Sequence, residues 1–154
     1  MKRLILAALL ALGLAASAAD LPYDEQADAK ADVKQALVDA HRSNKPVLLV
    51  FGANWCPDCR ALNQALKTEK NAGLIKQSFN VVKIDVGHFD KNLDIVTVYG
   101  DPIKKGIPAV VVLSPDNEVL YATKAGELAD ARSMNEDGVC GFFRDVVARA
   151  KAAN

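Results

Sequence analysis

The stretch Val47-Leu48-Leu49-Val50-Phe51-Gly52-Ala53-Asn54-Trp55-Cys56-Pro57-Asp58-Cys59-Arg60 decides the fold of this chain. Its first five residues form a continuous apolar run of strand length, which is typical of a strand covered on both faces. From Pro57 onward the apolar residues recur at helical spacing. Two cysteines therefore stand three positions apart where a buried strand gives way to a helix, and this junction is the strongest indication of chemistry in the sequence.

The placement of Cys56 and Cys59 favours thiol–disulfide exchange. Side chains three positions apart at the start of a helix come close enough to form a bridge. Cys56 also faces the unpaired N–H groups and the positive end of the helix dipole, which stabilise a thiolate. We expect an exposed Cys56 to attack and a more buried Cys59 to resolve the mixed disulfide. Pro57 suits the first helical position because its φ is fixed and it lacks an N–H donor.

Two other interpretations of the cysteine pair remain open at this point. The pair could be an inert structural disulfide, although so short a loop constrains the unfolded chain little. It could also be half of a zinc or copper site. Structural zinc usually takes four ligands, and the sequence has no second C-x-x-C motif, which leaves only Cys140 and His88 to complete such a site. We therefore predict no metal site.

The hydrophobic pattern predicts an α/β fold, with a central mixed β-sheet flanked by helices on both faces. Strands are expected at residues 47–51, 81–86, 109–113 and 119–122, the last two antiparallel across a turn. Helices are expected at residues 24–43, from residue 57, and around 74–79 and 93–99. A last helix is expected after a capping box formed by Ser133 and Glu136. No repeat or linker divides residues 20–154, so we expect one domain.

Residues 1–19 have the pattern of a secretory signal peptide. Lys2 and Arg3 precede an apolar run from Leu4 to Ala16, and Ala16-Ser17-Ala18 supplies the small residues for cleavage after position 18 or 19. The apolar run is too short for a bilayer core, which needs about 20 helical residues. We therefore expect a periplasmic or secreted protein, with no stable membrane insertion after cleavage.

Charge and cysteine content narrow the class further. The 154 residues include 19 basic and 19 acidic side chains, and loss of residues 1–19 removes two basic residues and leaves a net charge of −2. This balance does not suit a nucleic-acid-binding protein. Three cysteines are too few for a disulfide-built mini-protein and divide into one functional pair and Cys140. We expect Cys140 to be a half-buried free thiol, with an intermolecular disulfide as the alternative.

Two motifs, Phe51–Cys59 and Gly106-Ile107-Pro108-Ala109, resemble the thioredoxin superfamily, in particular secreted bacterial thiol:disulfide interchange proteins. The resemblance covers nearly all of residues 20–154. It implies a thioredoxin fold and a protein-disulfide oxidoreductase that exchanges electrons with protein thiols and disulfides through Cys56 and Cys59. The dithiol itself carries the two electrons, so we expect no cofactor, and an upstream redox partner protein must recycle it.

The resemblance also implies roles for residues outside the cysteine pair. Pro108 would be cis, would face the cysteines and would keep metal ions from the sulfurs. The Ile107 backbone would pair with an extended substrate segment. The docking surface would comprise Trp55, Ile107, Pro108 and Gly126.

The sequence departs from the thioredoxin pattern in two places, at Val50 and in the stretch 87–105. Val50 stands where thioredoxins carry a buried aspartate that accepts the proton of the resolving cysteine, so Cys59 must lose its proton in another way. Lys83 matches the lysine beside that aspartate, although an ordinary surface lysine is the alternative. The stretch 87–105 is longer than in a minimal thioredoxin, and we expect it to form a helical loop near the site. His88 in this loop is either a proton relay or a loop histidine.

Asp58 bears on the direction of electron flow. Its charge opposes the helix dipole and raises the cost of the Cys56 thiolate, and Arg60 offsets it in part. Strong oxidants depend on a heavily stabilised thiolate. We therefore predict a reductase or interchange protein rather than a primary oxidant. Separately, we expect the protein to be a monomer. The alternative function is a thioredoxin-fold binding module, a chaperone or metallochaperone, without redox turnover.

Overall fold

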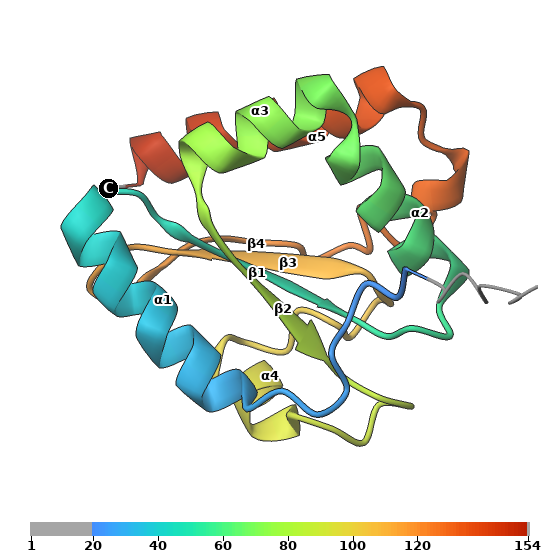
Figure 1. Ribbon diagram of the computed structural model, residues 1–154, viewed down its shortest axis with the longest axis horizontal. Coiled ribbons are helices and arrows are strands. Elements are labelled where there is room, and N and C mark those ends of the chain that lie inside the picture. The colour runs from blue at the N-terminus through green and yellow to red at the C-terminus, as the bar shows by residue number, and fades with distance from the viewer. Residues whose placement is uncertain (1–19, 154) are drawn as a thin grey trace, which may run out of the picture.

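A four-stranded mixed sheet organises the chain, and the computed structural model describes residues 20–153 (Figure 1). The strand order is β2-β1-β3-β4. Strand β1 (Val47–Gly52) runs parallel to β2 (Asn80–Asp85) and antiparallel to β3 (Ala109–Leu113), and β3 is antiparallel to β4 (Val119–Ala122). The predicted signal peptide, residues 1–19, lies outside the described residues. Between residues 20 and 153, no helix is long and apolar enough to cross a membrane.

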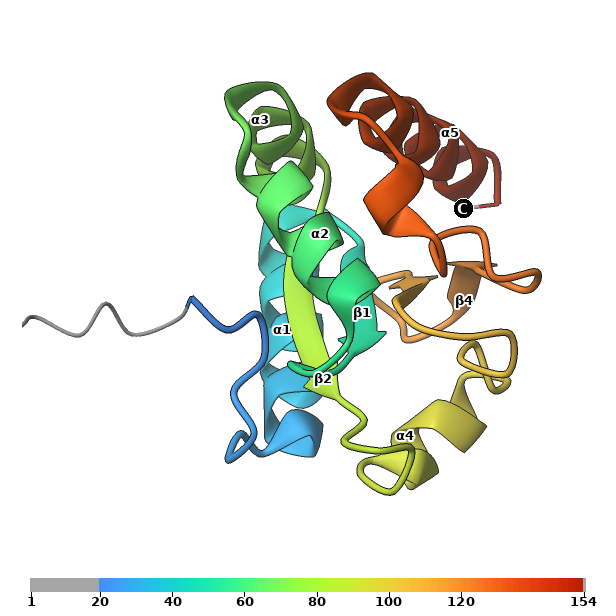
Figure 2. The same cartoon turned by 90° about the vertical axis from the view of Figure 1, so that its right-hand side faces the viewer.

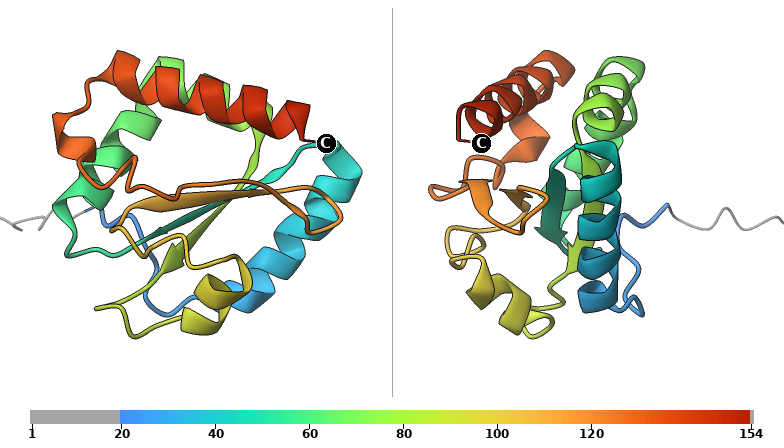
Figure 3. Two further views of the ribbon diagram at one scale, coloured as in Figure 1. Left: turned by 180° about the vertical axis from the view of Figure 1, so that it is seen from behind. Right: turned by 90° about the vertical axis from the view of Figure 1, so that its left-hand side faces the viewer.

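Helices cover both faces of the sheet (Figures 2 and 3). Helices α1 (Ala29–Ser43) and α4 (Leu93–Val98) pack on one face. Helices α2 (Pro57–Lys67), α3 (Glu69–Ser78) and α5 (Glu136–Ala152) pack on the other, and a 3-10 turn, η1 (Ala131–Ser133), precedes α5. The predicted α/β architecture, with a mixed sheet between two helical layers, is confirmed.

Strand β1 is buried along its whole length, as its apolar sequence predicts. Because side chains alternate along a strand, Val47, Leu49 and Phe51 pack toward α1 and α4. Leu48 and Val50 pack toward α2, α3 and α5. The strand therefore joins two separate hydrophobic clusters, and its carboxyl end leads directly to the cysteine motif.

The first helix is shorter than the sequence predicted. It begins at Ala29 rather than near residue 24, because Asp28 caps it by accepting a hydrogen bond from the Ala31 N–H at 3.1 Å. Residues 20–27 are not helical. From a position near the start of α2, they run past the end of β2 to α1 (Figure 1).

The predicted capping box of the last helix is also wrong. Asn135 is the N-cap of α5, and its side chain accepts a hydrogen bond from the Gly138 N–H at 2.7 Å. Ser133 belongs to η1, where its N–H is bonded to the Asp130 carbonyl at 3.0 Å. The two candidate caps, Ser133 and Asn135, stand two positions apart. Because Ser133 is taken up by the 3-10 turn, the helix begins after Asn135.

The corrected cap gives a direct test. Asn135→Ala removes the acceptor for the Gly138 N–H, and we expect it to lower the free energy of unfolding by about 1 kcal/mol. Ser133→Ala is the matched control, because Ser133 is exposed and does not cap the helix; its effect should stay within about 0.5 kcal/mol. Urea denaturation of both variants measures the difference, and a larger loss for Ser133→Ala would contradict the assignment.

Candidate active site

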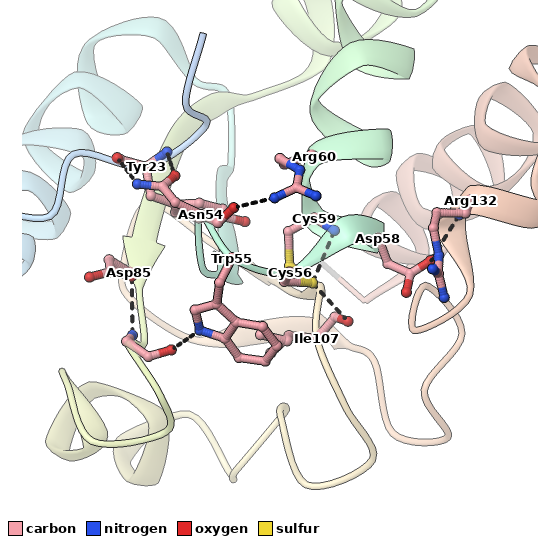
Figure 4. Close-up of a disulfide and its surroundings, with 11 residues drawn as sticks. Tyr23, Asn54, Trp55, Cys56, Asp58, Cys59, Arg60, Asp85, Ile107 and Arg132 are labelled. Carbon is pink, nitrogen blue, oxygen red and sulfur yellow. Dashed lines mark hydrogen bonds and ion pairs between the residues drawn. A yellow bond between two sulfur atoms is a disulfide. The ribbon is translucent and has the colours of Figure 1, made fainter. Parts of the chain in front are cut away.

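Cys56 and Cys59 form a disulfide at the amino-terminal end of α2 (Figure 4). Cys56 is the N-cap of the helix, and its sulfur accepts a hydrogen bond from the Cys59 N–H at 3.1 Å. Pro57 occupies the first helical turn, as predicted. The Cys56 sulfur therefore occupies the capping position, where a backbone N–H and the helix dipole stabilise negative charge.

The predicted contrast in exposure between the two cysteines is wrong. Cys56 is 3% exposed and Cys59 is 1% exposed, so both sulfurs are buried in the disulfide. The loop that precedes β3 covers Cys56: the carbonyl oxygen of Ile107 lies 3.7 Å from the Cys56 sulfur.

The Ile107–Pro108 loop lies beside the disulfide, and its peptide bond is cis. Both residues are buried. Gly126 lies against the same loop, because a side chain at Gly126 would come within 2.8 Å of the Lys105 carbonyl oxygen. The structure thus brings Ile107, Pro108 and Gly126 to one side of the cysteine pair.

Trp55, the residue before Cys56, is 44% exposed. Its indole N–H donates a hydrogen bond to the Gly87 carbonyl at 2.8 Å. The His88 ring stacks on it with a centroid distance of 5.3 Å, and the Phe89 ring meets it edge-on at 6.2 Å. The loop that was expected near the site therefore contacts Trp55 directly and includes the short helix α4. In this arrangement His88 packs against an aromatic ring.

The charge of Asp58 is paired differently from the sequence prediction. Asp58 is buried, and one carboxylate oxygen accepts hydrogen bonds from the Arg132 N–H at 2.9 Å and from its Nε at 3.1 Å. Arg60, the expected partner, instead donates to the Asn54 carbonyl at 3.0 Å. Figure 4 shows the Asp58 side chain directed toward Arg132. The arginine that offsets this charge comes from a loop 74 residues further along the chain.

A second group of contacts attaches the amino-terminal segment to the motif. The buried Asn54 side chain accepts a hydrogen bond from the Tyr23 N–H and donates one to the Tyr23 carbonyl, both at 2.9 Å. The same amide donates to the Glu25 carboxylate at 2.9 Å. Sequence reasoning missed Tyr23, Asn54 and Arg132. Asn54 belongs to the quoted motif, but no local signal indicates a partner 31 residues away.

Lys83 lies near Cys59 but is not bonded to a carboxylate. Its ammonium donates to the Asn63 side-chain oxygen at 2.6 Å. Partial burial, together with the charge of Lys67, lowers the pKa of Lys83 below its ordinary value. A cavity of about 10 Å³ is lined by Lys83, Asn63, Val50 and Cys59, among other residues.

Cys140 is a free thiol that is fully buried on α5, rather than half-buried.

Comparisons with known proteins agree with this fold. A family model described as thioredoxin-like matches residues 28–115. The crystal structure of a disulphide isomerase from Xylella fastidiosa Temecula1 is 57% identical, with a TM-score of 0.82, and covers 84% of this chain and 98% of that one. No curated protein matches the sequence.

Two more distant structures share the fold. A thioredoxin from Thermus thermophilus is 20% identical, with a TM-score of 0.57 over 77% of this chain and 86% of that one. The oxidised C-terminal domain of Neisseria meningitidis DsbD is 22% identical, with a TM-score of 0.51 over 75% and 94%.

The cysteine pair at a helix start beside a mixed sheet defines a thiol–disulfide oxidoreductase. The family match and the 57% identity show that the chain belongs to the thioredoxin-like family. The family and function implied by the sequence resemblance are confirmed, and the comparisons give the binding-module alternative no support.

The Asp58–Arg132 pair yields a stability prediction. Arg132→Gln removes the cation from a buried carboxylate, and we expect the free energy of unfolding to fall by about 1.5–3 kcal/mol. Asp58→Asn keeps an oxygen that can accept the Arg132 N–H, so it should lower the free energy of unfolding by less than Arg132→Gln does. Urea denaturation of both single variants and the double variant measures the coupling. Strictly additive losses would contradict an interaction between the two side chains.

Proposed function

We propose that the mature chain is a periplasmic protein that reduces or interchanges disulfides in polypeptide substrates, with Cys56 as the attacking and Cys59 as the resolving cysteine. The carrying observation is the position of the Cys56 sulfur, which caps α2 and accepts the Cys59 N–H. That hydrogen bond and the helix dipole stabilise the thiolate of Cys56 and also make it a good leaving group. Cys59 lies one helical turn further on, within reach of Cys56.

The proposed reaction in the reducing direction has two steps. The Cys56 thiolate attacks one sulfur of a substrate disulfide, that bond breaks, and the second substrate sulfur leaves with the electron pair and takes a proton. Cys59 then loses its proton and attacks the Cys56 sulfur. The mixed disulfide breaks, the first substrate sulfur leaves as a thiolate, and the Cys56–Cys59 disulfide forms. Two electrons have passed to the substrate, and a dithiol partner protein returns them.

We propose that the substrate docks as an extended segment on a rim made of Trp55, Ile107, Pro108 and Gly126. Supporting this, Trp55 directly precedes Cys56 and is partly exposed, and the Ile107 carbonyl oxygen lies 3.7 Å from the Cys56 sulfur. An incoming segment that pairs with the Ile107 backbone brings its cysteine to the Cys56 sulfur. The stacked His88 and Phe89 rings extend the apolar side of this rim.

Two observations support the compartment and the direction. The signal pattern of residues 1–19 favours export, and an oxidising compartment is where a disulfide interchange protein has substrates. The 57% identical relative is described as a disulphide isomerase, which favours interchange in this chain. We propose that the protein acts as a monomer.

The first test separates the two cysteines. Cys56→Ser should abolish reduction of insulin disulfides because the attacking sulfur is gone. Cys59→Ser should accumulate mixed disulfides, because nothing resolves them, and non-reducing gels with mass spectrometry should locate them on Cys56. Cys140→Ser is the matched control and should turn over normally, since its thiol is buried away from the pair. Normal turnover in either of the first two variants would refute the scheme.

The second test is the reduction potential of the Cys56–Cys59 pair. Between the cysteines only Asp58 carries a charge, and it is negative and held by Arg132. No cation stands between the two cysteines to add to the helix dipole, so we expect a potential below about −150 mV, on the reducing side of DsbA at about −120 mV. Equilibration with glutathione buffers measures it, and a value above −150 mV would reverse the proposed direction.

A further inference from the structure

Cys59 must ionise in surroundings that oppose ionisation. It is 1% exposed, and Val50, at the position expected from thioredoxins to hold a carboxylate, is an apolar side chain in the cavity beside it. Burial among apolar groups disfavours a thiolate. A polar group near the Cys59 sulfur is therefore needed when this cysteine attacks.

Tyr23 supplies such a group across Gly52, the last residue of β1. A methyl group on Gly52 would lie 2.6 Å from the Cζ of Tyr23 and 2.8 Å from the sulfur of Cys59. The phenol end of Tyr23 and the Cys59 sulfur therefore both border the space that a side chain at position 52 would occupy. Glycine is required here for close approach.

Tyr23 is held in this position from both ends. Its backbone is fixed by the two hydrogen bonds with Asn54, the residue before Trp55 in the motif. Its side chain is buried at 5% exposure and belongs to the same hydrophobic cluster as Cys59. The small cavity beside Cys59 is also lined by Tyr23 and Lys83, and its volume of about 10 Å³ is about the smallest that can hold one water molecule.

The Tyr23 hydroxyl remains a proton donor at any working pH. Burial, reinforced by the charge of Asp85, raises the pKa of Tyr23 well above its ordinary value. A neutral phenol cannot remove a proton from Cys59, but it can donate a hydrogen bond to the thiolate. The charged groups around this pair are Asp85 with its partner Lys91, and Lys83 with Lys67 and Asp20.

We propose that the Tyr23 hydroxyl donates a hydrogen bond to the Cys59 thiolate and so promotes resolution of the mixed disulfide. This rests on the proposed function, in which Cys59 attacks the Cys56 sulfur. The Cys59 proton passes to water through the small cavity, and the hydroxyl keeps its own proton throughout. The hydrogen bond lowers the pKa of Cys59 and raises the fraction that is thiolate near neutral pH.

The test measures the resolution step alone. The reduced mature protein is mixed with a fluorescent peptide whose single cysteine carries thionitrobenzoate. Attack by Cys56 releases the coloured thiolate, and the later fall in fluorescence anisotropy reports release of the peptide by Cys59. We expect Tyr23→Phe to leave the first phase unchanged and to slow the second about tenfold at pH 7, because a hydrogen bond to a charged group is worth about one pKa unit or more.

The pH profile separates this role from a structural one. In Tyr23→Phe the rate of the second phase should rise at a pH about one unit higher than in the wild type. The two rates should converge at high pH, where Cys59 is ionised in both proteins. Titration of the ¹³Cβ resonance of Cys59 should show the same upward shift. Tyr99→Phe is the matched control: its hydroxyl bonds Asn117 at 2.8 Å, at the far end of β3, and its loss should not move the profile.

Other outcomes would overturn the inference. A Tyr23→Phe profile that superimposes on the wild type, or that is slower by one factor at every pH, excludes the hydrogen bond. A shift in Lys83→Met with none in Tyr23→Phe assigns the role to the lysine. If Cys59→Ser traps no peptide on Cys56, the proposed function fails and this inference with it, whereas normal trapping with an unchanged Tyr23→Phe overturns the inference alone.

Discussion

The cap that Cys56 places on α2 is the interaction on which the rest of the site depends. A helix begins with N–H groups that lack partners, and here a sulfur accepts one of them. This requires a rigid approach to the first turn, which β1 provides because both of its faces are buried. The packing of the strand between two hydrophobic clusters thus holds the reactive atom in position, and the loop before β3 closes over it.

Much of the fold was predictable because it depends on local patterns. Strands β3 and β4 lie at their predicted bounds, and the end of β1 differs by one residue. The helix starts were less predictable, since several residues near each start can cap. Asp28 caps α1, which was expected to begin near residue 24, and Asn135 rather than Ser133 caps α5. Which candidate caps a helix depends on how the preceding loop arrives, and no local pattern carries that information.

The cysteine pair and the loop beside it were predictable from two motifs, whereas the charges and hydrogen bonds around them were not. Arg60 is the nearest arginine to Asp58 in the sequence, but helix α2 directs it toward Asn54 and the loop at η1 brings Arg132 instead. Likewise, the segment that covers Cys56 and buries it lies 51 residues away in the sequence. Electrostatic arguments from sequence neighbours therefore identified the charged residue beside the cysteines, Asp58, but assigned it the wrong arginine partner.

The hydrogen bonds between Asn54 and the Tyr23 backbone have a practical consequence for handling the protein. Residue 20 stands three positions before Tyr23, and its carboxylate pairs with Lys67 of α2, so anything joined ahead of it is attached to a segment that packs against the motif and its helix. The end of α5 lies at the opposite end of the sheet from the start of α2 (Figure 1). Affinity tags, reporter domains and surface tethers therefore belong at the carboxyl terminus, where they leave the amino-terminal segment free to pack against the motif.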